Sequence, residues 1–458
     1  MNPRTHPEKS NRAPAGCQHR HLFPRAGAAA LGGVAGGGFV PAVHAAGRES
    51  LKVALVGCGG RGAGAVSQIL QASPAVKLWA MADAFSDRLE TTLNLLTRGI
   101  DARYDREAHQ SLSTQIDVPP ERRFVGWDAY QRAIQGGIDA VILATTPHFR
   151  PMQFAYAVSR GVHAFIEKPV AVDAPGVRQV LAAGEEARKK NLKVAAGFHR
   201  RHDNIYQETI PRLQEGAIGQ LRFLRTYFNH AAMWNIPRQP EWNEMQYQMR
   251  NWQHFIWASG DHTCEQQAHS FHVVYWLLGR PPESAVGMGG RQVCTGAKYG
   301  DVFDHHAIEF TYADGLKLYA QCRQINGCWT NMSESVHGTK GWCEIEQKRG
   351  GVIHGKNAWS QRKQVANPYQ VEQNVFVDAI LHDKPHNEAE LAARSTMMSV
   401  MARMATYSGV EITWDRALSS KVKLGPKVYA WDAEPPLQPG PDGSYEHAVP
   451  RPGVWKDF

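Results

Sequence analysis

The pattern of apolar and polar positions changes character near residue 200. Before that point, short apolar runs alternate with segments that have helical spacing. The runs occupy residues 51–56, 76–82, 123–125, 139–144, 162–166 and 193–197, and the helical segments occupy 63–71, 85–96, 128–135, 151–160 and 174–190. Short apolar runs that alternate with helices are typical of buried parallel strands. The first half therefore predicts an α/β fold with a doubly wound parallel sheet.

In the second half, strand patterns dominate. They cover residues 221–228, 284–292, 306–312 and 317–323, and Ala313-Asp314-Gly315 predicts a hairpin between the last two. One amphipathic helix is expected over 262–278, ending before Gly279, and a later helix over 389–408 is expected to pack back near the first domain. This half predicts an α+β domain with an open, mostly antiparallel sheet.

The chain of 458 residues is too long for one ordinary core. We predict a first domain over 51–198, a second over 199–415, and an arm over 416–458. The arm is rich in Pro, Gly and Trp, and is expected to wrap the surface or a neighbouring subunit. A polar segment that ends near Arg122 predicts a surface flap.

Residues 1–46 resemble an export signal. A basic, polar start precedes an Ala- and Gly-rich stretch, and Val43-His-Ala-Ala46 offers a small-residue cleavage site. The segment that begins His19-Arg20 resembles a twin-arginine signal in which His19 replaces the first arginine. That route carries folded proteins, so it favours a periplasmic protein that keeps its cofactor tightly bound. No later run is long and apolar enough to predict a membrane span.

The distribution of charge does not indicate nucleic-acid binding, and the spacing of the cysteines does not indicate a zinc site. The formal charge is +8, but five of the basic residues lie in the leader and the others are scattered rather than grouped in a stripe. We therefore expect no nucleic-acid partner. The seven cysteines include no C-x-x-C pair, and a Cys322–Cys328 bridge is left open.

The segment that begins at Leu51 carries a dinucleotide fingerprint in its required context. An apolar run leads directly into Gly57-Cys-Gly59-Gly-Arg-Gly62 and then into a helical pattern. The three glycines allow a tight turn, close approach of a pyrophosphate, and packing of the helix on the strand. Asp83 ends the next run, about 20 residues past the third glycine, where a carboxylate binds ribose hydroxyls. Asp83 favours NAD over NADP, although Arg61 would partly offset its repulsion of a 2′-phosphate.

Two further strand ends are expected at the same crevice. Thr145, Thr146 and His148 follow the run over 139–144, and Glu167 and Lys168 follow the run over 162–166. We interpret all five as cofactor-binding. Lys168 would also donate to a substrate hydroxyl or take its proton, unless it is an ordinary surface lysine before a turn.

Glu265 and His269 lie four residues apart on the expected helix, and therefore on one face. A carboxylate beside an imidazole is the pairing expected of a proton acceptor and its orienting partner. A metal site formed with His262 is disfavoured, because the spacing is not H-E-x-x-H. A purely structural His/Glu pair is the plainer alternative.

These motifs together carry a resemblance. The glycine fingerprint, Ala144-Thr-Thr-Pro-His148, Ile166-Glu-Lys-Pro-Val170 and the E-x-x-x-H helix are similar to those of the glucose-fructose oxidoreductase, inositol dehydrogenase and rhizopine-catabolism (Gfo/Idh/MocA) family. The segments 289–292, 322–329 and 333–341 resemble an exported branch of that family. The resemblance implies redox chemistry at a sugar or polyol carbon, with Lys168 and His269 as catalytic residues. It also implies an open-sheet domain that mediates dimers or tetramers. Glu265 stands where the family usually has Asp.

We expect the side chains that contact a sugar to be aromatic residues and arginines. Trp faces stack on sugar rings and Arg reads hydroxyls or a carboxylate, which makes Arg250, Trp252, Arg323 and Trp329 candidates. The resulting hypothesis is an NAD(P)-dependent oxidoreductase that acts on a sugar, glycoside or polyol. Two alternatives remain: a redox-assisted glycosidase that restores its own NAD, and a catalytically silent sugar-binding protein.

Overall fold

The computed structural model describes residues 50–98, 112–346 and 349–456. Its first sheet has six parallel strands in the order β3-β2-β1-β4-β5-β6. The strands are β1 (Leu51–Val56), β2 (Val76–Asp83), β3 (Arg123–Val125), β4 (Ala140–Leu143), β5 (His163–Ile166) and β6 (Val194–Ala196). The order reverses between β1 and β4, and in open α/β sheets ligands bind beside the carboxyl ends of the strands at such a point.

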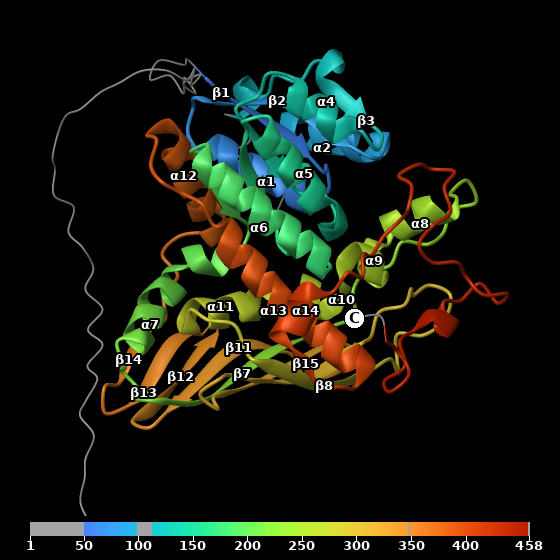
Figure 1. Ribbon diagram of the computed structural model, residues 1–458. Helices are drawn as coiled ribbons and strands as arrows, with labels where there is room; N and C mark the ends of the chain where they lie inside the picture. The colour runs from blue at the N-terminus through green and yellow to red at the C-terminus, as the bar shows by residue number, and fades with distance from the viewer. Residues whose placement is uncertain (1–49, 99–111, 347–348, 457–458) are drawn as a thin grey trace, which may run out of the picture. The chain divides into compact units, whose positions relative to one another are not determined.

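Helices cover both faces of this sheet (Figure 1). One face packs against α4 (Ala129–Gln135), α5 (Arg150–Ser159) and α6 (Ala174–Lys189). The other packs against α1 (Gly60–Ala72), α2 (Ser86–Arg98) and α12 (Pro368–Leu381), which comes from the distant end of the chain. Alternate residues of β1 serve the two cores, Val56 in one and Leu55 in the other.

The second sheet has nine strands in the order β14-β13-β12-β11-β7-β10-β9-β8-β15, and only β7 and β10 pair in parallel. In chain order they are β7 (Leu221–His230), β8 (Ser284–Gly290), β9 (His305–Thr311), β10 (Lys317–Gln324), β11 (Asn331–Gly338), β12 (Gly341–Glu346), β13 (Gly350–Gly355), β14 (Trp359–Gln361) and β15 (Ile412–Thr413). The helices α7 (Asn204–Gln214), α11 (Ala268–Leu278) and α13 (Ala389–Ser408) lie between this sheet and the first (Figure 1). As expected, α13 packs against α6 of the first domain.

The predicted fold class and the four expected strands of the second half are confirmed, including the β9–β10 hairpin. One expected helix is wrong in part, because residues 262–278 form α10 (Asp261–Glu265) and α11, which are separated at Gln266-Gln267. The expected surface flap lies mainly in residues 99–111, outside the described part of the chain. Its described end forms short 3₁₀ turns at Ser113–Gln115 and Pro120–Arg122.

The arm begins after α14 (Trp414–Ser419) and runs back over the first domain. The Trp431 ring centroid lies 4.7 Å from that of Trp127 and 4.9 Å from that of Phe85. The Tyr429 hydroxyl lies 3.0 Å from His148 Nε2. The arm therefore wraps the surface of its own chain.

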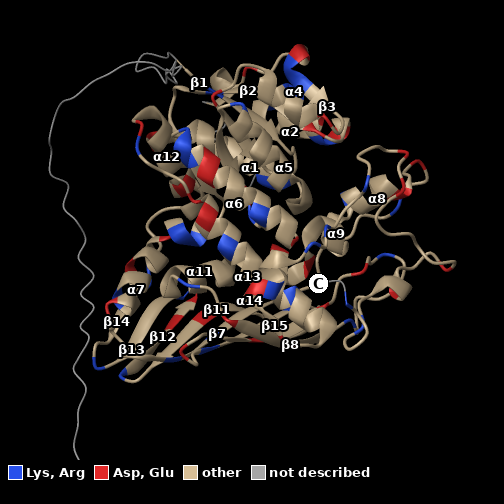
Figure 2. Ribbon diagram, viewed as in Figure 1, with Lys and Arg blue, Asp and Glu red and all other residues tan. Residues whose placement is uncertain are grey.

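Basic and acidic residues are interspersed over the helices and strands of both halves (Figure 2). Within the described residues, no helix has the length and apolarity needed to span a bilayer. The six described cysteines are free, so Cys322 and Cys328 are not bridged.

Candidate functional site

A cavity of about 800 Å³ lies along the carboxyl ends of β1, β2, β4 and β5. It extends from the glycine turn after β1 to the helix ends at Glu265 and His269. The topology explains this position, because the carboxyl ends of parallel strands share one edge of a sheet. The cavity brings together most of the residues that the sequence singled out.

The three glycines have distinct surroundings. Gly57 has φ +98°, and a Cβ there would lie 2.4 Å from the Thr145 backbone nitrogen. A Cβ on Gly62 would lie 2.1 Å from the Gly57 carbonyl oxygen, so Gly62 allows α1 to pack against the turn. Gly59 lines the cavity and has nothing within 4 Å of its Cβ position. This open cradle before the first turn of α1 fits a pyrophosphate.

Asp83 lines the cavity at the end of β2. Its carboxylate accepts hydrogen bonds from the backbone nitrogens of Cys58, at 2.6 Å, and Phe85, at 2.9 Å. Burial raises the pKa of Asp83, and the two amide donors oppose that rise. These contacts fix the carboxylate beside the glycine turn, where ribose hydroxyls would reach it.

The contacts of Arg61 lie away from the end of the cavity that Asp83 lines. Its Nε lies 3.0 Å from Glu167 Oε1, and its guanidinium sits 4.7 Å from the centre of the Tyr369 ring. Arg88 also lines the cavity, and its charge lowers the pKa of Asp83. Sequence reasoning missed Arg88, although its position shortly after the acidic strand end was a usable signal.

The residues after β4 divide between the cavity and the core. Thr145 and Thr146 both line the cavity, and the buried Thr146 hydroxyl has no hydrogen-bond partner in the protein. An orphaned buried hydroxyl facing a cavity fits a site for a polar ligand. His148 instead lies outside the lining, buried beneath Tyr429, and burial lowers its pKa to about 3. The short turn Pro147–Phe149 carries it away from the crevice.

The segment around α8 (Glu244–Arg250) covers part of the cavity. Both terminal nitrogens of Arg250 bind the Asp87 carboxylate, at 2.8 Å and 3.0 Å, which ties this segment to the first domain. The guanidinium also lies 4.0 Å from the centre of the Phe85 ring. Trp431 of the arm packs against the Phe85 and Trp127 rings. We call Arg250, Phe85, Trp127 and Trp431 the roof.

Lys168 and Glu265 form a buried ion pair in the cavity wall. Lys168 Nζ lies 2.9 Å from Glu265 Oε1 and 2.8 Å from the Glu265 carbonyl oxygen. The expectation that Glu265 orients His269 is therefore wrong. The break between α10 and α11 removes the helical i, i+4 geometry, and Glu265 turns to the ammonium instead. Two of the three ammonium protons are engaged, which leaves one donor for a substrate oxygen.

His269 is the second residue of α11 and lines the same part of the cavity. It lies against His199, with ring centroids 4.7 Å apart, and its Nδ1 has no hydrogen-bond partner. Burial, reinforced by the positive charge of Lys168, lowers the pKa of His269 well below its ordinary value. The imidazole is therefore uncharged near pH 7. Sequence reasoning missed His199, for which no motif gave a signal.

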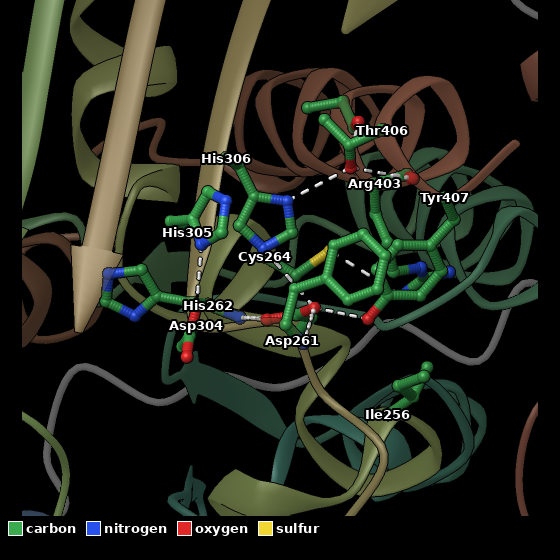
Figure 3. A network of polar contacts seen from close by, with 12 residues as sticks. Ile256, Asp261, His262, Cys264, Asp304, His305, His306, Arg403, Thr406 and Tyr407 are labelled. Carbon is green, nitrogen blue, oxygen red and sulfur yellow. Dashed lines mark hydrogen bonds and ion pairs between the residues drawn. The ribbon is translucent and has the colours of Figure 1, made fainter. Parts of the chain in front are cut away.

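A buried polar network supports α10 from behind (Figure 3). Asp261 has φ +72° and no solvent exposure. It accepts hydrogen bonds from the Tyr407 hydroxyl and the Phe303 backbone nitrogen, and His306 Nε2 lies 3.4 Å away. These contacts come from three separate parts of the second domain. They fix the start of the short helix whose last residue is Glu265.

Two of the four expected sugar contacts are misplaced. Arg250 and Trp252 line the cavity, whereas Arg323 and Trp329 do not. Along β10 alternate residues are buried, and Arg323 falls on the outer face, where it donates to the Trp329 carbonyl oxygen. The cavity is instead lined by Trp234, Asn235 and Gln253, which no motif indicated.

Within the described residues, no group of three or more His, Cys, Asp or Glu side chains is arranged to hold a metal ion. His262 is enclosed by Phe228 and His230, and burial lowers its pKa to about 3. Lys168 and His269, which line the cavity beside the glycine cradle, can exchange protons with a ligand.

The parallel sheet, the glycine cradle and the fixed Asp83 carboxylate define a dinucleotide-binding protein of the Rossmann class. The chain belongs to the Gfo/Idh/MocA family: residues 51–198 match the model of its oxidoreductase family NAD-binding Rossmann fold, and residues 206–344 match a model of its C-terminal domain.

Relatives agree with this assignment. Inositol 2-dehydrogenase 4 of Saccharopolyspora erythraea is 26% identical over 231 residues, which are 50% of this chain and 55% of the relative. Among solved structures, aldose-aldose oxidoreductase of Caulobacter crescentus, complexed with glycerol, has TM-score 0.60 at 17% identity. Scyllo-inositol dehydrogenase of Lactobacillus casei, with bound NAD(H) and scyllo-inositol, has TM-score 0.58 at 18% identity. Both comparisons cover 80% of this chain and 99% of the other. The chain spans about half the length of the curated relatives it matches.

Proposed function

We propose that this protein is an NAD(P)-dependent oxidoreductase that transfers a hydride between a sugar, glycoside or polyol carbon and a tightly bound nicotinamide cofactor. The carrying observation is that Lys168, Glu265 and His269 line the same cavity as the glycine cradle and Asp83. Relatives named as inositol dehydrogenases support a polyhydroxyl substrate.

Each group has a defined task. NAD, when bound, accepts the hydride. The third N–H of the Lys168 ammonium donates a hydrogen bond to the reacting oxygen, and the Glu265 carboxylate holds that ammonium in place. The neutral His269 imidazole takes the hydroxyl proton as the carbonyl forms. The buried surroundings strengthen each of these electrostatic contacts.

Asp83 favours NAD, because its fixed carboxylate would repel a 2′-phosphate. Arg88 at the same end keeps NADP as an alternative cofactor. The roof supports tight retention, since it joins the chain's last segment and the α8 segment across the nucleotide end. A retained cofactor would be reduced by one sugar and reoxidised by another.

The test is single-turnover reduction of protein-bound NAD by a panel of sugars and polyols, followed at the nicotinamide absorbance. The proposal expects NADH to appear with at least one substrate and to be reoxidised by a carbonyl sugar. No absorbance change with any substrate would refute it. Release of free sugar from a glycoside without net NADH would favour the redox-assisted glycosidase instead.

We further propose that residues 1–46 direct export to the periplasm. The supporting observation is the leader-like sequence with its small-residue cleavage site. Cell fractionation with N-terminal sequencing of the mature protein tests this. An intact N-terminus in the cytoplasmic fraction would contradict it.

We also propose a homo-oligomer formed through the outer face of the second sheet. Large apolar side chains are exposed there, namely Met288, Tyr319 and Trp342. A face of this kind is typical of a protein–protein contact. Light scattering of the parent protein and of a Trp342→Glu variant tests the proposal. A monomeric parent would refute it.

A further inference from the structure

Trp234 is a large aromatic side chain that lines the cavity and yet is 43% exposed. It follows β7, whose last residue, His230, lies with its ring centroid 4.7 Å from that of His262. His262 belongs to α10, the helix that also carries Glu265. Four extended residues span at most about 14 Å, and Trp234 lines the same cavity as the proton-transfer groups Lys168 and His269.

The backbone around Trp234 is held rigidly. His254 is buried and its Nε2 donates to the Trp234 carbonyl oxygen at 2.8 Å. Asn251 is fully buried and binds both backbone groups of Ile236, at 2.8 Å and 3.0 Å. Two buried side chains thus hold in place a segment that has no regular secondary structure. An exposed indole on so fixed a backbone is preorganised for a ligand.

Several of the neighbouring lining residues are polar and uncharged. Asn235 and Gln266 line the cavity, and Gln253 carries a buried amide oxygen that has no hydrogen-bond partner in the protein. Arg250 is the cationic residue of this segment that lines the cavity, and it forms an ion pair with Asp87. The chemistry offered here is an aromatic face with amide donors and acceptors, which suits a neutral polyhydroxyl ring.

We propose that Trp234 and Gln253 form a subsite for a second, uncharged sugar ring, so that the substrate is a glycoside or disaccharide rather than a free polyol. This inference rests on the proposed function, because that function places the reacting ring beside Lys168 and His269. The second ring would stack on the Trp234 indole. Gln253 would then receive a hydrogen bond from one of its hydroxyls.

The test is calorimetric binding of maltose, cellobiose, lactose and trehalose, and of their monosaccharides, to the NAD-loaded protein. Trp234→Ala should weaken the best disaccharide about tenfold and change monosaccharide affinity less than about twofold. Trp234→Phe should keep most of the affinity, and Gln253→Ala should weaken the disaccharide severalfold. Trp329→Ala is the matched control, because Trp329 is a 58% exposed tryptophan outside the cavity lining.

Equal weakening of mono- and disaccharides by Trp234→Ala, an equal effect of Trp329→Ala, or no disaccharide binding by the parent would overturn the subsite. Failure of the proposed function looks different. In that case Trp234-dependent disaccharide binding persists while no sugar reduces the bound NAD.

Discussion

Replacing Lys168 with methionine should destabilise the protein, because Glu265 would keep a buried charge without a partner. The two side chains are 13% and 11% exposed, and Glu265 Oε2 already lacks a hydrogen bond. Removing one partner of a fully buried pair costs about 3–5 kcal/mol. The slight exposure to the cavity reduces the expected cost of Lys168→Met to about 2–3 kcal/mol.

The double variant Lys168→Met, Glu265→Gln should be more stable than Lys168→Met alone. Glutamine leaves no buried charge, so the double variant should lose only about 1 kcal/mol relative to the parent, the value of an ordinary hydrogen bond. Glu265→Gln alone should also cost about 2–3 kcal/mol, because it leaves the buried Lys168 ammonium without a counter-charge.

Urea unfolding of the four proteins without sugar measures these differences as a double-mutant cycle. Lys189→Met is the control, because Lys189 is an exposed lysine at the end of α6. Single-variant costs that simply add up in the double variant would show that the two charges are not coupled. That result would refute the ion pair as the support of the reacting ammonium.

Four further outcomes follow from the site. His269→Ala should lower single-turnover NAD reduction by about 10²–10⁴, with a residual rate that rises at alkaline pH and with unchanged NAD affinity; an unchanged rate would remove His269 from catalysis. Asp83→Ala should weaken NAD and narrow its advantage over NADP in a binding titration, whereas an unaltered preference would contradict the role of that carboxylate. Trp431→Ala should raise the NAD dissociation rate severalfold in a cofactor-chase experiment, and no change would mean that the roof does not retain the nucleotide. Burial raises the pKa of Asp301 to about 7 from an ordinary value of 3.8. The unfolded chain therefore loses this proton first, so stability should fall as pH rises from about 4 to 7; Asp301→Asn should flatten that slope in thermal melts, and an identical slope would refute the assignment.

The fold of the first domain could be predicted from the sequence because the motifs that indicate it are local. The glycines at 57, 59 and 62 and the acidic end of β2 act within one strand–turn–helix unit, and apolar runs mark each buried parallel strand. Family resemblance then indicated Lys168 and His269, and the structure places both on the cavity.

The second domain was harder to predict because some of its strands, such as β11, lack a regular alternation of buried and exposed residues. In β11, Ser333 and Glu334 are adjacent and both buried, and Glu334 pairs with the buried Arg200. Buried polar residues such as these interrupt the alternation of apolar and polar positions from which a strand is predicted. The contact between Glu265 and Lys168 was missed for a related reason. It depends on a helix break at Gln266, and no glycine or proline in the sequence marks that break. Trp234 lies on an irregular segment whose position depends on distant side chains.

The arm has a consequence for the order in which this protein matures. Trp431 and Tyr429 pack on Trp127, Phe85 and His148, which belong to the domain synthesised first. The ribosome therefore releases almost the whole chain before the nucleotide end of the cavity can close. A cofactor that binds during synthesis would therefore reach the first domain before the arm covers that end. We expect a chain truncated before Tyr429 to release its nucleotide faster than the full chain, because it would lack the Trp431 contacts of the roof.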